Sequence, residues 1–231
     1  MTAPNVIDCN ALDHAFGTGE ARAQVLFGVN LAIAQGEFVV LKGASGSGKT
    51  TLLTLLACLR EIQGGAVEVL GNRLDGARAK RLVEVRRRLG FIFQSHNLHP
   101  ALSALQNVRM GLELHGSPAM GNWQQAATHM LTCLGLGERL DYLPAKLSGG
   151  QTQRVAITRA LVGNPEIVFA DEPTAALDSE SGRKVVDILK ELGRRRGTTS
   201  LVITHDPRVL DRADRVVTLV GGRITNESRR P

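Results

Sequence analysis

The sequence has few cysteines, few aromatic residues and no long hydrophobic run. Its three cysteines are scattered and odd in number, which fits a reduced compartment and argues against a disulfide framework or a cysteine-based metal site. The longest apolar runs fall far below the ~18 residues that a membrane-spanning helix needs. Residues 1–5 lack a basic segment leading into an apolar core, so we expect no signal peptide.

Aromatic residues make up 3% of the chain, too few for a surface on which nucleic-acid bases stack. The net charge is +6, and basic residues gather over 78–88, at 194–196 and at 229–230. We interpret these clusters as solvated helix faces, with nucleic acid or an anionic membrane surface as the alternatives. At 231 residues and 43% hydrophobic content, the chain is expected to form one globular domain with a substantial core.

A glycine-rich stretch over 43–51 matches the phosphate-loop pattern G-x-x-x-x-G-K-S/T. An apolar strand-like run precedes it, and an apolar pattern at helical spacing follows it. Glycines let backbone N–H groups turn toward an anion, and the helix N-terminus adds partial positive charge. In such a loop Lys49 reaches the β- and γ-phosphates, and the Thr50 hydroxyl binds Mg²⁺. The candidate nucleotide-binding residues here are Gly43, Ser45, Gly46, Ser47, Gly48, Lys49, Thr50 and Thr51.

Hydrophobic periodicity places the remaining elements. Strands are expected over 6–12, 25–33, 37–41, 66–70, 89–93, 166–170, 200–204, 215–220 and 223–225. Helices are expected over 52–59, 78–88, 103–115, 122–134, 152–162 and 179–196. A loop is expected at 17–20 and a breaker at Gly116-Ser117-Pro118, and Gly64-Gly65 is expected to end the helix region that follows the phosphate loop. Because no strand signal occurs between Gln94 and Gly163, this stretch is interpreted as a helical insertion in an alternating α/β chain.

The apolar run over 166–170 predicts a buried parallel strand that leads directly into Asp171 and Glu172. Ligands of open α/β sheets bind at the carboxyl ends of strands, so both acids are expected beside the phosphate loop. Asp171 would hold Mg²⁺, and Glu172 would orient and deprotonate the attacking water. A helix-capping acidic pair is the structural alternative.

A second glycine-rich helix start occurs over 147–151, which reads Leu-Ser-Gly-Gly-Gln, with Ser148 as a natural N-cap. A helix N-terminus with two glycines is again an anion cradle. One nucleotide does not need two cradles in one chain. The segment resembles the signature motif of ATP-binding cassette (ABC) ATPases, which other phosphate-loop classes lack.

Other marks of this family occur in the right order. Gln94 resembles the Q-loop glutamine, residues 176–178 resemble the D-loop, and His205 resembles the switch histidine. The resemblance covers essentially the whole chain and implies an α/β P-loop NTPase core with a parallel sheet, an N-terminal antiparallel β subdomain and an inserted helical subdomain. Within this single ATP-binding domain, the core with its β subdomain would span 1–94 and 163–231. The helical subdomain, with the signature motif, would span about 95–162.

The resemblance also assigns roles at the nucleotide. Lys49 and the backbone N–H groups of 46–51 would hold the phosphates of ATP. The residues that would meet Mg²⁺ are Thr50, Gln94 and Asp171, and the catalytic residues would be Glu172, His205 and Gln94, with His205 steadying the γ-phosphate. Phe16 falls where an adenine-stacking aromatic is usual, although that residue is more often Tyr; an ordinary strand aromatic is the alternative.

In the family, the signature segment closes over ATP bound to the partner subunit, so that two chains enclose two nucleotides. The residues that would act across this interface are Ser148, Gly149, Gly150 and Gln151, and Asp178 would couple the two sites. Because phosphoryl transfer is catalysed mainly by positioning and charge stabilisation, hydrolysis is expected to need the closed dimer.

Within the family, the runs over 93–98 and 170–178 look closest to DevA-type exporter ATPases, which are relatives of the MacB and LolD ATPases. Such subunits dock on a separate membrane permease and, with a periplasmic adaptor, drive export of lipids or similar cargo. The resemblance thus implies a peripheral protein on the cytoplasmic face of the inner membrane. Thr152 and Thr158 depart from the residues that are common after the signature. This affects the subfamily assignment, because neither lies at a phosphate-binding position.

Three other functions are less consistent with the sequence. A soluble ABC ATPase acting on nucleic acid or ribosomes would typically carry two cassettes or a long coiled-coil insertion, and this chain has one cassette and no heptad run. No nucleic acid is therefore expected as a partner. A non-hydrolytic binding module is disfavoured because Lys49, Glu172 and His205 are all present. Importer ATPases often carry an extra C-terminal domain, whereas this sequence stops soon after Ile224.

Overall fold

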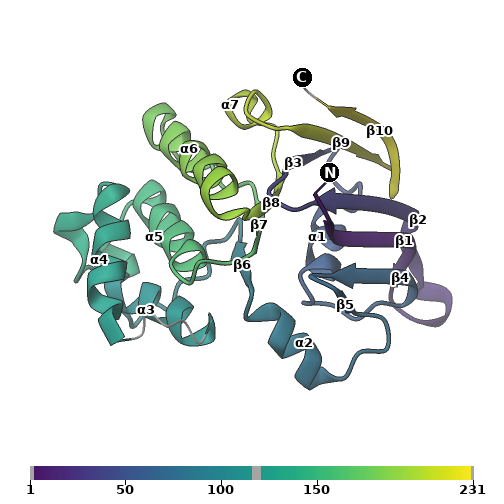
Figure 1. Ribbon diagram of the computed structural model, residues 1–231, viewed down its shortest axis with the longest axis horizontal. Coiled ribbons are helices and arrows are strands. Elements are labelled where there is room, and N and C mark those ends of the chain that lie inside the picture. Colours follow the sequence, from purple (N-terminus) through teal and green to yellow (C-terminus); the bar gives the residue numbers. More distant parts are fainter. Residues whose placement is uncertain (1–2, 116–120, 230–231) are drawn as a thin grey trace.

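The computed structural model describes residues 3–115 and 121–229. Two β-sheets lie side by side, and a group of helices packs at the far end of the larger sheet (Figure 1). The larger sheet has the strand order β10-β9-β3-β8-β7-β6, and the smaller one has the order β2-β1-β4-β5. Within the described residues, no helix combines the length and the apolar character that crossing a membrane requires.

The six-stranded sheet is parallel from β9 to β6, and β10 pairs antiparallel with β9. Its strands are β3 (Phe38–Lys42), β6 (Leu89–Ile92), β7 (Ile167–Asp171), β8 (Thr199–Ile203), β9 (Arg215–Val220) and β10 (Arg223–Arg229). Residues of β7 and β8 are buried along their whole length, because helices or the second sheet cover both faces. Unbroken apolar runs suit such doubly covered strands.

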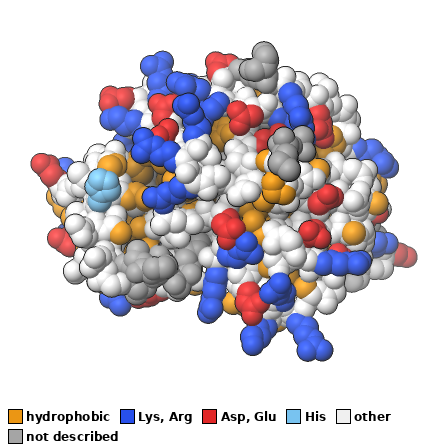
Figure 2. Space-filling model, viewed as in Figure 1, with side chains coloured by type: hydrophobic (Ala, Val, Ile, Leu, Met, Phe, Trp, Pro, Cys, Tyr) orange, Lys and Arg blue, Asp and Glu red, His pale blue; other side chains and the backbone are white. Residues whose placement is uncertain are grey.

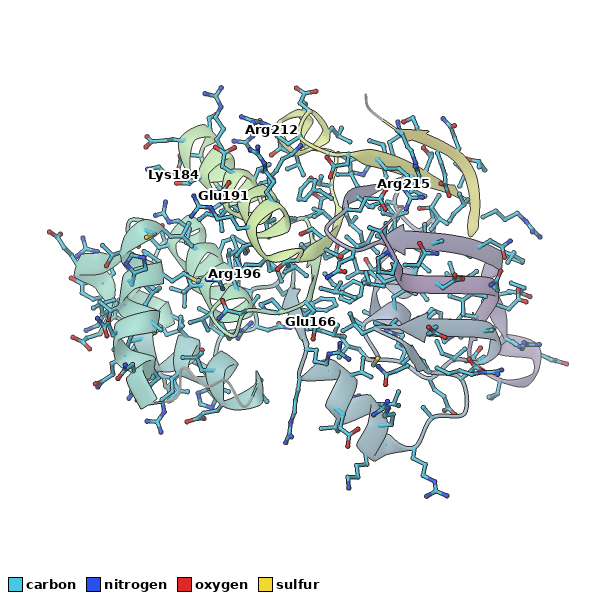
Figure 3. All side chains as sticks on the ribbon, viewed as in Figure 1. Glu166, Lys184, Glu191, Arg196, Arg212 and Arg215 are labelled. Atoms are coloured by element: carbon cyan, nitrogen blue, oxygen red, sulfur yellow. The ribbon has the colours of Figure 1, made fainter. Side chains whose placement is uncertain are left out.

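The four-stranded sheet is antiparallel and alternates buried with exposed side chains. Its strands are β1 (Asn5–Phe16), β2 (Ala23–Ala34), β4 (Gly64–Val69) and β5 (Asn72–Arg73). One hydrophobic core joins this sheet, α1 (Lys49–Leu56) and one face of the larger sheet. Arg215, which is buried, adds a polar tie, since its guanidinium donates to the Ala32 carbonyl of β2 at 2.5 Å and to Glu227 of β10 at 2.9 Å (Figure 3).

Helices α3 (Ala104–His115), α4 (Trp123–Cys133) and α5 (Gly149–Leu161) form a separate hydrophobic cluster at one end of the molecule (Figure 1). The cluster consists of Ala104, Val108, Leu112, Ala127, Leu131, Leu136, Val155 and Val162. On its other side α5 joins the core beneath α6 (Ser179–Arg196) through Ile157 and Leu161. The remaining helices are α2 (Ala79–Arg86), α7 (Pro207–Leu210) and short 3₁₀ turns at Gly19–Ala21, Gly137–Arg139 and Pro144–Lys146.

Most predicted elements are confirmed, and the expectation of an N-terminal antiparallel sheet beside a parallel one is correct. Within 94–115 and 121–163 the structure contains helices and turns and no strand. Gly64-Gly65 was expected to end the helix region, with a strand over 66–70, whereas β4 (Gly64–Val69) already begins at this pair. Gly65 has φ 88°, and a Cβ would lie 2.4 Å from the Ala11 carbonyl oxygen, so glycine is needed where the strands approach. Gly116-Ser117-Pro118 lies outside the described residues.

Candidate nucleotide site

The phosphate loop connects β3 to α1, and its glycines are required by close packing. A Cβ on Gly43 would lie 2.1 Å from the Leu219 carbonyl oxygen. Gly48 is the N-cap of α1 with φ 97°, and a Cβ there would lie 2.8 Å from Leu26. Among the described residues, no side chain caps the N-terminus of α1. The first N–H groups of this helix therefore face the loop as free donors, which suits a phosphate.

Two side chains of the loop are arranged for an anionic ligand. The Lys49 ammonium donates to the Gly43 and Ala44 carbonyl oxygens, both at 2.8 Å, so the lysine is folded over the loop. The Ser47 hydroxyl is buried and finds no hydrogen-bond partner among the described residues. A buried hydroxyl without a partner is costly unless a ligand oxygen satisfies it. The loop thus fits the phosphates of a nucleotide.

Strand β7 places an acid beside the loop. Asp171 is 8% exposed, and its Oδ2 accepts a 2.8 Å hydrogen bond from the Thr50 hydroxyl of α1. Gln94, which follows β6 and is exposed, lies at the same pocket. Hydroxyl, amide and carboxylate oxygens are the ligands that Mg²⁺ prefers, so this donor set fits that ion. Residues 3–115 and 121–229 hold no cluster of three His, Cys, Asp or Glu side chains that would suggest a different metal.

These groups line one pocket of about 460 Å³. Its lining residues are Val25, Ser45, Gly46, Gly48, Lys49, Thr50, Thr51, Gln94, Asp171, Glu172, Ile203 and His205. The sequence reasoning missed Val25 and Ile203, which close the pocket from β2 and from the end of β8. Both are apolar strand residues without a local signal for ligand binding. The pocket thus collects residues from five separate segments of the chain. Four of them lie at the carboxyl ends of the parallel strands β3, β6, β7 and β8, where ligands of α/β sheets bind, and Val25 comes from the antiparallel sheet.

Glu172 is held in an unusual backbone conformation at the rim. Its φ is 47°, which a glutamate adopts only under structural constraint. Its N–H donates to the Ile203 carbonyl at 2.9 Å, and its Oε2 accepts from the Thr204 hydroxyl at 3.0 Å. Thr204 was not among the predicted site residues, although it directly precedes His205. It fixes the Glu172 carboxylate while His205 stands exposed at the same pocket.

Phe16 lies at the end of β1 and lines a neighbouring pocket of about 380 Å³. Its ring is 38% exposed. The Arg60 guanidinium lies over this ring at 5.0 Å from the centroid, and the His14 ring meets it edge-on at 4.9 Å. The sequence reasoning did not anticipate Arg60. Burial lowers the pKa of His14, so its imidazole is neutral and adds to the apolar side of the platform.

The second glycine-rich segment lies away from this pocket. Ser148 caps α5 with a complete capping box, in which its hydroxyl accepts from the Gln151 N–H and the Gln151 side chain accepts from the Ser148 N–H. Ser148 and Gly149 are exposed. A Cβ on Gly150 would lie 2.9 Å from the Ala176 carbonyl oxygen, so α5 packs tightly against the 174–178 loop.

Asp178 ends that loop and caps α6. Its carboxylate accepts from the Ser181 N–H and hydroxyl, both at 2.8 Å, and the backbone donor is the main reason that its pKa is lowered. Asp178 is exposed and lies outside the lining of the phosphate pocket. The structure therefore brings the phosphate loop, Gln94, Asp171, Glu172 and His205 together, and places Phe16, 148–151 and Asp178 elsewhere.

Comparison with known proteins identifies the family. A family model described as ABC transporter matches residues 26–175, more than half of the chain. The chain belongs to the ABC transporter ATP-binding proteins. This ABC protein is 42% identical to the ABC transporter ATP-binding protein YbbA of Escherichia coli K12, over 99% of this chain and 100% of that protein. It is 40% identical to the lipoprotein-releasing system ATP-binding protein LolD 1 of Caulobacter vibrioides, over 98% and 97%.

Two further likenesses extend this result. The chain is 43% identical to the macrolide export ATP-binding/permease protein MacB 1 of Aeromonas hydrophila over 97% of this chain and 35% of that longer protein. The fold superposes with a TM-score of 0.91 and 37% identity on the dimeric ATP-binding cassette MJ0796 bound to ADP and Pi, covering 96% of this chain and 98% of that one. The expected ABC ATPase fold is therefore confirmed, and the protein is an ATPase of the ABC class. The assignment to the DevA type stays a prediction.

Proposed function

We propose that this protein is the ATP-hydrolysing subunit of an ABC exporter, pairing with a second copy of itself around two ATP molecules to drive a separate membrane permease. One observation supports this most. The chain carries two helix N-termini fit for phosphate, and the one at Ser148 is exposed and lies outside the pocket formed by the other. If this exposed segment binds the nucleotide of a second subunit, both its exposure and the presence of two such helix N-termini are explained.

Within the pocket each residue would have a distinct task. Lys49 and the N–H groups of 46–51 would bind the β- and γ-phosphates. Thr50, Asp171 and Gln94 would hold Mg²⁺, which when bound neutralises charge on the phosphates. His205 would steady the γ-phosphate, and Phe16 would stack against adenine on the face that Arg60 leaves open.

Glu172 would act on the attacking water as general base. Its carboxylate has one oxygen fixed by Thr204 at 3.0 Å, which leaves the other to accept a proton. The constrained backbone at φ 47° and the Thr204 bond together hold the carboxylate in place, so the water would be aligned with little reorganisation. Ser148, Gly149, Gly150 and Gln151 would bind the γ-phosphate held by the partner subunit, and Asp178 would lie at the same interface.

The helical region would take part by moving as a unit. We infer that residues from about 95 to 162 form a subdomain, because α3, α4 and α5 share a cluster of their own. The remainder, 1–94 and 163–231, would form the core and its β subdomain. Since α5 also contacts the core through Ile157 and Leu161, a rotation of this subdomain would carry the segment at Ser148 toward a partner's nucleotide.

The permease would dock in an apolar groove between α2 and α3. This groove has a volume of about 580 Å³ and is walled by Phe91, Phe93 and Met110, with the exposed side chains Val83 and Leu114 at its edges. The groove residue Phe93 directly precedes Gln94 of the nucleotide pocket, so an occupant that displaces Phe93 would also move Gln94.

Charge favours an occupant with acidic residues. The Arg86 and Arg159 guanidinium groups line the groove and donate to uncharged backbone carbonyls, Cys58 at 2.8 Å and His96 at 2.8 Å, so their charges are not neutralised by these contacts. Lys and Arg side chains also project from the lower edge of the molecule, where Figure 1 places α2 (Figure 2). An amphipathic permease helix with acidic flanks would complement this surface.

The finer parts of the proposal rest on the relatives. LolD 1 belongs by name to a lipoprotein-releasing system, and MacB 1 joins an ATP-binding part and a permease in one macrolide exporter. We therefore propose a lipid or similar cargo, a periplasmic adaptor as a further partner, and a peripheral location on the cytoplasmic face of the inner membrane.

A pull-down tests the proposal and its docking surface together. The tagged chain is recovered from detergent-solubilised membranes and its partners are identified by mass. Leu114→Asp places a charge on a groove residue that is 67% exposed, and Val220→Asp is the matched control on β9, at 55% exposure. We expect the wild type and Val220→Asp to recover a permease with an adaptor, and Leu114→Asp to lose both. Recovery of ribosomes or nucleic acid without a membrane protein would overturn the exporter assignment.

A further inference from the structure

Arg208, in the first turn of α7, bridges two loops that flank the nucleotide pocket. Its Nε and Nη2 donate to the two carboxylate oxygens of Asp206, at 2.9 and 2.6 Å. Its Nη1 donates to the Asp178 main-chain carbonyl at 3.1 Å. The planar guanidinium with its fixed donors is the group that can make these contacts at once.

On one side, this bridge continues to the catalytic carboxylate. The Asp206 N–H donates to the Thr204 hydroxyl oxygen at 3.0 Å, and the Thr204 hydroxyl donates to Glu172 Oε2 at 3.0 Å. The Asp206 side chain is fixed from a further direction by the buried Thr174 hydroxyl at 2.7 Å. Asp206 also directly follows His205. A displacement of Asp206 would therefore shift His205 and Glu172, the residues proposed to act on the γ-phosphate and on the water.

On the other side, the bridge reaches the signature helix. Asp178 caps α6 through Ser181, and the Ser181 hydroxyl accepts from Arg154 of α5 at 2.5 Å. Arg154 also lies 3.9 Å from the Asp178 carboxylate. A continuous series of polar contacts thus runs from α5, which begins at Ser148, through Asp178 and Arg208 to Glu172.

The packing around Arg208 shows that the bridge is built into the fold. The guanidinium lies against Gly182 of α6, where a Cβ would be 2.8 Å from Nη1 and 3.0 Å from Cζ. Capping of α7 by the Asp206 side chain through the Arg208 N–H would need no guanidinium at all. Glycine in a helix interior is destabilising, so the stability of α6 does not explain Gly182. Its lack of a side chain leaves the room that the guanidinium occupies.

We propose that Arg208 is a positioning residue that couples the 174–178 loop and the signature helix to the Glu172 carboxylate, so that hydrolysis proceeds when a partner subunit fixes Asp178. The proposal rests on the proposed function, in which 148–151 and Asp178 lie at the dimer interface. Arg208 does not line the nucleotide pocket, so it would act through Asp206 and Thr204.

Three variants test it by turnover number and by ATP affinity. Arg208→Lys keeps the charge but has no planar fork that could hold Asp206 and the Asp178 carbonyl together. Gly182→Ala displaces the guanidinium while favouring the helix, so a loss of turnover could not be ascribed to unfolding. Arg212→Ala is the control, since Arg212 lies nearby in an exposed pair with Asp187 (Figure 3).

We expect Arg208→Lys and Gly182→Ala to lower kcat roughly tenfold, with the Kd for ATP within about twofold of wild type, because a coupling contact is lost and no binding contact is. Arg212→Ala should retain wild-type values. Wild-type kcat in both test variants would overturn the proposal, and so would a parallel tenfold loss of ATP affinity, which would indicate general damage to the pocket. Absence of hydrolysis in the wild type itself would instead refute the proposed function.

Discussion

Helices α1 and α5 both begin at glycine-rich segments, yet the backbone N–H groups at their N-termini are capped differently. At α1, no described side chain caps the helix, the Ser47 hydroxyl has no partner among the described residues, and Lys49 folds over the loop. At α5, Ser148 and Gln151 satisfy each other in a complete capping box. The N-terminus of α1 is thus held in place by the surrounding sheets without a cap from any described side chain, whereas the N-terminus of α5 is stabilised by its own capping residues on the surface.

This difference indicates that the N-termini of α1 and α5 have different roles. The α1 site is open to a ligand, because no described side chain caps its helix N-terminus, which faces a pocket lined by an acid on a buried strand. The α5 segment presents exposed Ser148 and Gly149 and half-buried Gly150 at a helix N-terminus, which suits an anion that arrives from outside. The comparison predicts that damage at α1 affects ATP binding or chemistry within one chain, and that damage at α5 affects turnover only.

The largest effect is expected on the α1 side from Glu172→Gln. This substitution would remove the proposed general base while keeping the size of the side chain and its contact with Thr204. We expect turnover, measured as phosphate release, to fall on the order of a thousandfold with ATP binding retained. Glu191→Gln, at an exposed ion pair on α6, should change neither value. Turnover within tenfold of wild type would exclude Glu172 as the base.

Ser148→Asp sharpens the comparison from the α5 side. Aspartate caps a helix as well as serine does, so the fold of α5 is kept, but its charge opposes a phosphate. Turnover should fall about a hundredfold while each chain binds ATP within about twofold of wild type, as measured by equilibrium titration. Ser228→Asp on the exposed β10 strand is the control. A large loss of ATP affinity in Ser148→Asp would place this segment in its own chain's pocket.

Lys49→Ala is expected to have the opposite signature. In the proposed site the ammonium group would supply a charged donor to the phosphates, and such a bond contributes about 1.5–3 kcal/mol, so ATP affinity should fall about 10- to 100-fold. Lys42→Ala, at the exposed end of β3, is a matched control. Isothermal titration with both variants checks this. Unchanged affinity in Lys49→Ala would contradict the assignment of the phosphate loop.

The smallest effect concerns acid stability at the Arg208 bridge. Hydrogen bonds from the Arg208 guanidinium hold the pKa of Asp206 below its usual value near 3.8. A lowered folded-state pKa contributes stability that is complete above about pH 3.8 and is lost as the pH falls through the folded value. Arg208→Ala should therefore raise the midpoint of acid unfolding, on the order of a few tenths of a pH unit.

Circular dichroism during acid titration measures this shift. Arg212→Ala should leave the midpoint unchanged, because its ion pair with Asp187 is more than half exposed and contributes little. A midpoint that moves equally in both variants, or in neither, would mean that the Arg208–Asp206 contact stabilises the folded state no more than an exposed ion pair does.

Elements with strong local signals could be predicted from the sequence alone. Helix α6 was predicted over 179–196, and the structure has the same bounds, because Asp178 caps its start and Gly197, at φ 68°, ends it. The phosphate loop and the pair Asp171-Glu172 were also found, since each is a short contiguous pattern beside an apolar strand.

Other features depend on contacts that no local pattern encodes. The helix after the phosphate loop was expected over 52–59, but α1 ends at Leu56, because Cys58 adopts φ 58° within the core. Strand β10 extends to Arg229 through polar residues that pair with β9 and bury little. The bonds from Thr204 to Glu172 and from Arg208 to Asp178 join segments 32 and 30 residues apart, so the sequence offered no sign of them.

The central claim is that the segment at Ser148 acts on the nucleotide of a partner chain, and a mixing experiment tests it most directly. Glu172→Gln and Ser148→Asp chains are each assayed alone, then mixed in equal amounts with ATP and Mg²⁺. A mixed dimer has one site in which the intact Glu172 of one chain faces the intact Ser148 of the other. Random pairing makes half of the dimers mixed, each with one complete site, so the account predicts recovery of roughly a quarter of wild-type turnover. A mixture as inactive as its separate components would contradict it.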